Sequence, residues 1–278
     1  MKRSRRGRTA GPGLFDRLRR TGGLLLSREV TVLNNAIAFN FLLCLFPLLL
    51  VVVAAAHRLA PGGATATALR LVLSELIPVG QETLASALRQ MTRLAPGFQA
   101  LSLGLVVWGS SGIFIPVERV LNIVWGARAE RSFWKSRLLA FLLTLAGALA
   151  ALVSVALTLY GRALPRMAVY PQLEAPVALV ASWAAKAVAL ALGWALFTLV
   201  YRVAPSAPVG WSVAWRAGLW AACAWEASKY AFVWNLQRMQ LQTFYGPLAF
   251  AVALVLWAYV SSVVLVFGAG MAKAPERG

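Results

Sequence analysis

Long apolar runs separated by short polar segments dominate this chain. Six of the runs are long enough to cross the ~30 Å hydrocarbon core of a bilayer as helices of about 20 residues. They cover approximately Leu33–Ala56, Phe98–Val117, Leu138–Tyr160, Pro176–Tyr201, Val213–Leu236 and Leu248–Phe267. The pattern therefore predicts an all-α, polytopic membrane protein with six transmembrane helices.

Residues 64–95, between the first and second runs, have a different pattern. Apolar residues recur there at helical spacing, and Pro78 and Gly80 interrupt them. This indicates two amphipathic helices lying at the membrane surface. The expected organisation is a basic tail over residues 1–28, a membrane domain over residues 29–272 and a short end over residues 273–278.

Composition excludes an ordinary soluble domain, because 60% of the residues are hydrophobic and only 13% are charged. The net charge is +18, and nine of the 27 Lys and Arg residues lie in the first 28 positions. Basic residues beside a membrane span mark the cytoplasmic side and attract anionic lipid. The segments on the side of the termini hold 18 Lys and Arg against 7 on the opposite side. Both termini are therefore expected in the cytoplasm, with membrane lipids as partners, including anionic lipid at the basic tail.

Four polar residues inside the predicted spans are candidates for an intramembrane site: Asn40, Lys186, Glu226 and Lys229. Glu226 follows Trp215 by eleven residues, or about 16 Å at 1.5 Å per residue, which places it near the middle of the core. An ionisable residue at that depth is a functional-site hypothesis. The alternative is structural, because Glu226 and Lys229 share one helix face and can neutralise each other.

Residues that break or kink a helix form a second group of candidates for a cavity. Gly and Ser allow close helix packing, and they also tolerate an unwound segment that lines a cavity. Pro removes a backbone donor and kinks a span. These candidates are Pro47, Gly109, Ser110, Ser111, Gly112, Tyr245 and Gly246.

No cofactor, metal site or catalytic motif is expected. The chain has two Cys, Cys44 and Cys223, and one His, His57, too few for a four-ligand metal site. Phosphate-loop, zinc-protease and serine-hydrolase motifs do not occur in the sequence. Basic residues without interleaved aromatic residues give no basis for specific nucleic-acid binding. We therefore expect a protein that is not an enzyme.

Several stretches together resemble the YihY/virulence factor BrkB family of bacterial inner-membrane proteins, for which an older name is ribonuclease BN. The resemblance covers nearly the whole chain after the basic tail. It is carried by residues 35–39, 45–48, 108–112, 121–125, 201–205, 217–229, 245–248 and 257–259.

The resemblance implies six helices and cytoplasmic termini, and some family members look like factors of serum resistance or envelope integrity. One departure concerns the last span. Family members commonly end it with Gly-Ala-Glu, whereas this chain reads Gly268-Ala269-Gly270.

Two functions fit these observations. The first is a transporter or flippase-like protein for an amphipathic, lipidic or anionic envelope-related substrate. The second is a non-transporting scaffold for envelope integrity that recruits lipids or proteins. A cavity that contains Glu226 would favour transport, whereas a dry bundle would favour the scaffold. Small-residue helix faces would permit a homo-oligomer, but nothing in the sequence specifies one.

Overall fold

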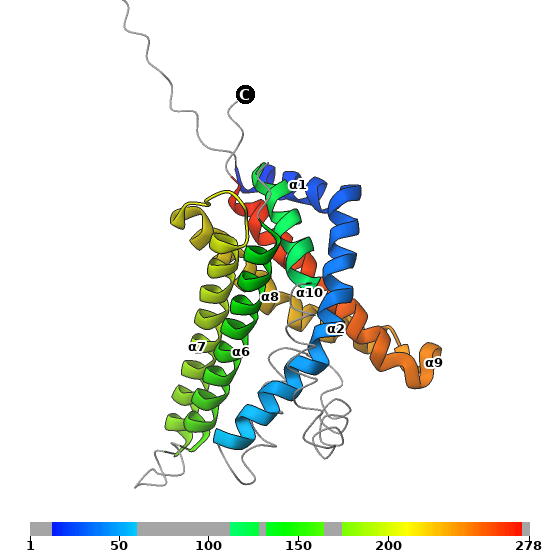
Figure 1. Ribbon diagram of the computed structural model, residues 1–278. Helices are drawn as coiled ribbons and strands as arrows, with labels where there is room; N and C mark the ends of the chain where they lie inside the picture. The colour runs from blue at the N-terminus through cyan, green and yellow to red at the C-terminus, as the bar shows by residue number, and fades with distance from the viewer. Residues whose placement is uncertain (1–12, 60–111, 128–131, 164–173, 274–278) are drawn as a thin grey trace, which may run out of the picture.

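A computed structural model of the chain describes residues 13–59, 112–127, 132–163 and 174–273. Every regular element in these ranges is helical, so the all-α fold class is confirmed there. The helices are α1 (Leu14–Leu25), α2 (Arg28–Leu59), α6 (Phe133–Ala163), α7 (Glu174–Val203), α8 (Trp211–Arg238), α9 (Leu241–Tyr245), η3 (Gly246–Leu248) and α10 (Ala249–Ala272). Residues 112–125 form a further helix, which Figure 1 leaves unlabelled.

The long helices form a bundle in which successive elements alternate in direction (Figure 1). Helix α8 packs against both α7 and α10, α6 packs on α7, and α2 packs on α10. Five observed helices extend the expected spans by a few residues, α2, α6, α7 and α8 at both ends and α10 at its C-terminal end. The expected amphipathic helices over residues 64–95, and most of the second expected span, lie outside the described residues.

By length and composition, two stretches of described helix can cross a membrane. They are Lys186–Val203, within α7, and Ala249–Ala272, which is the whole of α10. The number of six spans stays a prediction.

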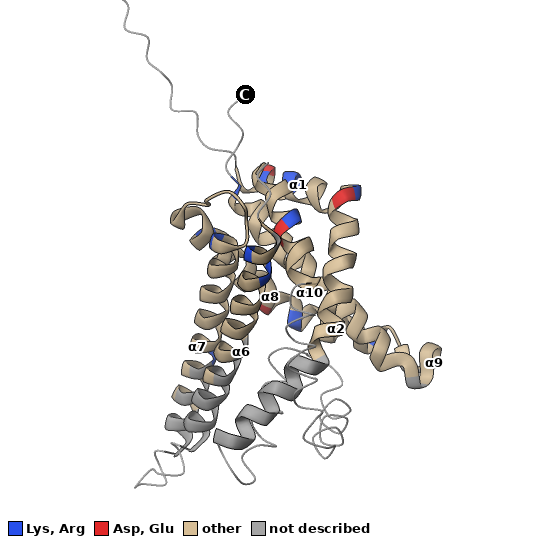
Figure 2. Ribbon diagram, viewed as in Figure 1, with Lys and Arg blue, Asp and Glu red and all other residues tan. Residues whose placement is uncertain are grey.

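Charged residues gather at one end of the bundle, here called the charged end (Figure 2). This end holds α1, the starts of α2, α6 and α8, and the ends of α7 and α10. Its described basic residues include Arg17, Arg19, Arg20, Arg28, Lys135, Arg137, Arg202 and Lys273. Four segments far apart in the sequence therefore contribute positive charge to the same end of the fold, as the charge count predicts.

Small residues let α10 approach α7 and α8 closely. A methyl group on Gly268 would lie 2.6 Å from the Tyr201 hydroxyl oxygen and 2.9 Å from the Ala217 carbonyl oxygen. This approach lets the Tyr201 hydroxyl donate a 2.7 Å hydrogen bond to the Leu265 carbonyl, which joins α7 to α10. Because Tyr201 is fully buried, the bond satisfies a polar group that would otherwise be costly.

Helix α1 lies within the segment expected as a basic tail over residues 1–28. It lies across the end of the bundle and packs on α10 (Figure 1). Thr21 is its buried anchor, and the Thr21 hydroxyl lies 3.6 Å from Met271 Sδ. Gly270 makes this contact possible, since a methyl group there would lie 2.7 Å from Thr21 Cγ2. The departure from Gly-Ala-Glu thus coincides with a tight α1–α10 contact.

Restoring the acidic residue by the substitution Gly270→Glu is expected to lift α1 from α10. Overpacking of this kind costs about 1–3 kcal/mol. Limited trypsin cleavage at Arg17, Arg19 and Arg20 should become faster. Gly23→Ala is the control, because nothing lies within 4 Å of a methyl group at Gly23. Unchanged cleavage in Gly270→Glu would contradict the contact.

Candidate functional site

The Glu226–Lys229 pair lies in the middle of α8. Lys229 Nζ is 2.8 Å from Glu226 Oε1, the close contact that their spacing of three residues permits. Glu226 lies 15 residues after the first residue of α8 and 12 before the last, roughly 18–22 Å from each end of the helix. The Glu226 side chain keeps 33% of its surface exposed, against 15% for Lys229. The carboxylate is therefore the more accessible member of the pair.

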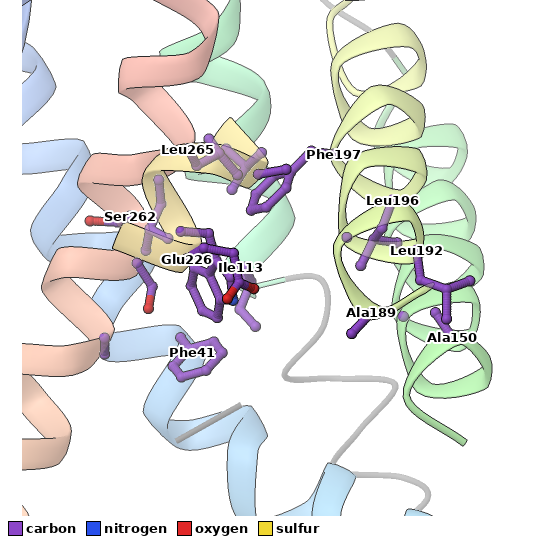
Figure 3. A pocket seen from close by; sticks show the side chains of 18 of the residues that line it. Phe41, Ile113, Ala150, Ala189, Leu192, Leu196, Phe197, Glu226, Ser262 and Leu265 are labelled. Carbon is purple, nitrogen blue, oxygen red and sulfur yellow. The ribbon is translucent and has the colours of Figure 1, made fainter. Parts of the chain in front are cut away.

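Glu226 faces a cavity of about 300 Å³ inside the bundle, here called the central cavity (Figure 3). Its described lining comes from six helices: α2, the helix over residues 112–125, α6, α7, α8 and α10. Its lining residues are Ile37, Phe41, Ile113, Val117, Gly147, Ala150, Ala189, Leu190, Leu192, Gly193, Leu196, Phe197, Ala222, Trp225, Glu226, Ala258, Ser261, Ser262 and Leu265. Glu226 is the one charged residue among them.

Small side chains leave room for this cavity. Gly147, Ala150 and Gly193 line it from the α6–α7 pair, and Ala222 and Ala258 line it from α8 and α10. In Figure 3, Ala150, Ala189 and Leu196 face the cavity from one side, while Phe41, Ile113 and Glu226 face it from the other. Small residues on a helix commonly form packing faces, but these border open space.

Aromatic rings surround the region next to Glu226. The Trp225 ring lies 6.2 Å from the Phe197 ring and 5.1 Å from the Trp257 ring, measured between centroids. Phe232 packs on the same Trp257, at 5.1 Å. Trp225 and Phe197 line the same cavity as Glu226.

The other two predicted intramembrane residues lie away from the cavity lining. Lys186 is exposed on α7, with its Nζ 5.0 Å from the centre of the Trp183 ring. Asn40 donates a 2.8 Å hydrogen bond to the Ala36 carbonyl in its own helix. The structure therefore brings together Glu226 and Lys229 only.

The predicted helix-break residues occupy several settings. Gly112 is in close contact with Asn40, and a methyl group there would overlap Asn40 Oδ1. Pro47 lies within α2, which bends along its length in Figure 1. Tyr245 ends α9, and Gly246 begins η3 with φ of +50°, a backbone conformation that favours glycine. Gly109, Ser110 and Ser111 lie outside the described residues.

Sequence reasoning missed a buried polar cluster near the charged end. The Glu118 carboxylate accepts hydrogen bonds from the Ser136 hydroxyl at 2.9 Å and the Ser206 hydroxyl at 2.7 Å. Asn122 adds a 3.0 Å bond to the Ser206 hydroxyl and accepts one from the Ser206 amide at 2.9 Å. The cluster joins the helix over residues 112–125 to the start of α6 and to the segment after α7. The spacing of Glu118 and Asn122, one helical turn apart, was the available sequence signal.

Two family-like stretches meet beside this cluster. The rings of Trp125 and Tyr201 are 5.8 Å apart in an edge-to-face arrangement, which joins residues 121–125 to residues 201–205. Within the described part of the chain, no group of three or more His, Cys, Asp or Glu residues could hold a metal ion.

Comparison with known proteins finds relatives among bacterial membrane proteins. A UPF0761 membrane protein of Ralstonia nicotianae is 30% identical over 213 residues, which cover 72% of this chain and 45% of the relative. A UPF0761 membrane protein of Aromatoleum aromaticum is 28% identical over 255 residues, with 90% and 61% covered. The ribonuclease-like protein YfkH of Bacillus subtilis is 23% identical over 239 residues, with 84% and 85% covered.

The chain spans about half the length of the first of these relatives. No solved structure matches it. The model of the family described as virulence factor BrkB matches residues 25–277, which include every helix from α2 to α10. This chain is a membrane protein that belongs to the virulence factor BrkB family.

Proposed function

We propose that this protein is a transporter or flippase-like protein of the bacterial inner membrane that moves an amphipathic or lipidic envelope-related substrate. The central cavity carries the proposal. It combines an almost wholly apolar lining with one carboxylate at the middle of the bundle. An apolar pocket with few polar groups is the usual form of a small-molecule site, and a volume of about 300 Å³ is within the range of such sites.

The proposal places six spans across the membrane. Helices α2, α6 and α8 have 32, 31 and 28 residues, each longer than the ~20 residues that a crossing needs. With α7, α10 and the segment that ends in the helix over residues 112–125, they make six crossings. The charged end would face the cytoplasm, because Lys and Arg gather on that side of membrane proteins. Both termini would then be cytoplasmic, and Glu226 would lie near the bilayer midplane.

Thiol labelling tests whether a water-filled path reaches this site. In a background of Cys44→Ala and Cys223→Ala, single cysteines replace residues of α8 from Leu219 to Val233. Ala222, which lines the cavity, should react with membrane-impermeant reagents. Ala231, exposed on α8 and absent from the lining, is the control that should face lipid and react little.

Labelling of Ala222→Cys from either side of the membrane would support transport. Protection of both cysteines from both sides would instead mean a sealed bundle, and the transport proposal would fail. Movement itself is measured with vesicles that contain the purified protein and a fluorescent single-chain lipid, by loss of fluorescence when a reductant is added outside. A rate no higher than in protein-free vesicles would also overturn the proposal.

A scaffold function is the second candidate, and α1 favours it. Phe15, Leu18 and Leu26 are exposed at 78%, 43% and 84% along or just after α1, with Arg17, Arg19 and Arg20 between them. Apolar and basic residues on one short helix fit a surface with anionic headgroups. This candidate needs no cavity and predicts that α1 variants, rather than Glu226 variants, impair the envelope. Neither candidate assigns catalysis, a cofactor, specific nucleic-acid binding or an oligomeric state to the chain.

A further inference from the structure

We propose that the central cavity binds single-chain amphiphiles with a cationic, ammonium-type head group, and that the head group lies against Glu226. This inference rests on the proposed function, because it concerns the same cavity. It adds the charge of the head group of the ligand that the cavity binds. Three observations support it separately. They are the apolar lining of the cavity, the hydrogen bonds that its polar side chains already make, and the aromatic residues that line it together with Glu226.

The lining selects an apolar chain. Of the six helices around the cavity, four contribute only apolar side chains or glycine: α2, the helix over residues 112–125, α6 and α7. Burying an alkyl chain against them removes apolar surface from water without leaving a polar group unpaired. A volume of about 300 Å³ suits one chain rather than a complete two-chain lipid.

The polar atoms of the lining favour a ligand that brings positive charge or hydrogen-bond donors. The Ser261 hydroxyl already donates to the Trp257 carbonyl at 2.7 Å, and the Ser262 hydroxyl donates to the Tyr259 carbonyl at 2.8 Å. The ion pair with Lys229 engages Glu226 Oε1, so lone pairs on Oε2 are available to a donor in the cavity. The only formal charge that the described lining presents is therefore negative.

Aromatic rings beside the carboxylate strengthen this selection. Trp225, Phe197 and Phe41 all line the cavity. An ammonium group is attracted to the face of an aromatic ring, most strongly to Trp, and quaternary ammonium groups are recognised in this way. A phosphate head group in the cavity would instead be repelled by the Glu226 carboxylate. Lys229 does not line the cavity, so its positive charge is not presented to the ligand there. The arrangement favours an ammonium head group over a phosphate.

Quenching of Trp225 fluorescence tests the inference without measuring transport. The full chain is placed in zwitterionic bilayers at about 0.15 M salt, where charges outside the site are screened. Three probes with the same bromine-bearing dodecyl chain are compared: a trimethylammonium, a phosphate and a neutral alcohol. The signal from the cavity is the part of the quenching that Trp225→Phe removes.

We expect saturable quenching by the ammonium probe at a concentration about tenfold below that of the phosphate probe, which corresponds to about 1.4 kcal/mol. Glu226→Gln should abolish this preference. Glu226→Gln with Lys229→Met should also abolish the preference. Because this double variant has no net charge at the pair, an added positive charge is not the cause. Lys186→Met, which changes an exposed charge outside the lining, should leave the preference unchanged.

Equal or tighter binding of the phosphate probe would overturn the inference in favour of an anionic amphiphile. A preference that survives Glu226→Gln, or quenching that never saturates, would also overturn it. The outcomes for the two proposals are distinguishable. Saturable binding of the ammonium probe without lipid movement in vesicles would refute transport alone, whereas lipid movement with no preference for the ammonium probe would refute this inference alone.

Discussion

Replacing Gly218 by alanine is expected to separate α7 from α8 and to destabilise the whole bundle. A methyl group at Gly218 would overlap Thr198 Oγ1 and would lie 2.9 Å from the Thr198 amide nitrogen and 3.0 Å from the Trp194 carbonyl oxygen. Two of these atoms belong to the backbone of α7, so no side-chain rotation relieves the contact. We expect a loss of about 1–3 kcal/mol and a melting temperature lowered by several degrees in detergent.

Two further variants show whether close helix approach is the cause. Gly193→Ala adds the same methyl group to α7 at a position with nothing within 4 Å, so it should keep or slightly raise the melting temperature. Thr198→Ala combined with Gly218→Ala removes only the side-chain overlap and should recover only part of the loss. Full stability of Gly218→Ala alone would mean that the helices are not packed as described.

The sequence predicts the helices better than it predicts the space between them. The apolar runs predict the bounds of α7 and α10 to within a few residues. A helix that is apolar on most sides is recognised from the length of its apolar run, so the periodicity of the run matters little. The depth and spacing of Glu226 and Lys229 also predict their contact, since residues three apart on a helix are neighbours. These are local properties of one segment.

The central cavity and the Glu118 cluster depend on contacts between segments far apart in the chain. Gly193 and Gly218 are both glycines in apolar helices, yet one borders a cavity and the other touches the backbone of α7. Glu118 gains its partners from residues 18 and 88 positions away. Single-sequence patterns carry no signal for such pairings, so the charge of the cavity lining could be inferred only from the fold.

The second large effect is expected when either member of the central ion pair is removed alone. Lys229→Ala leaves the Glu226 carboxylate without its cation, and Glu226→Ala leaves the Lys229 ammonium without that carboxylate. An ionised side chain at the centre of a membrane span costs about 2.5–3.5 kcal/mol on insertion scales. Each single variant should therefore lower the free energy of unfolding clearly, measured as denaturation in mixed micelles. The double variant should lose much less than the sum of the two, because it contains no uncompensated charge.

These single and double variants form a double-mutant cycle. The cycle separates a structural role of the pair from a functional one when stability and transport are measured on the same variants. A stable Glu226→Gln, Lys229→Met double variant that still moves lipid would show that the pair only neutralises itself. The same variant, stable but unable to move lipid, would show that the charges act on a ligand. Lys186→Met is the matched control for transport, since Lys186 is exposed on α7 and lies outside the cavity lining. If the single losses were additive in the double variant, the pair would not be coupled, and the 2.8 Å contact would contribute nothing measurable.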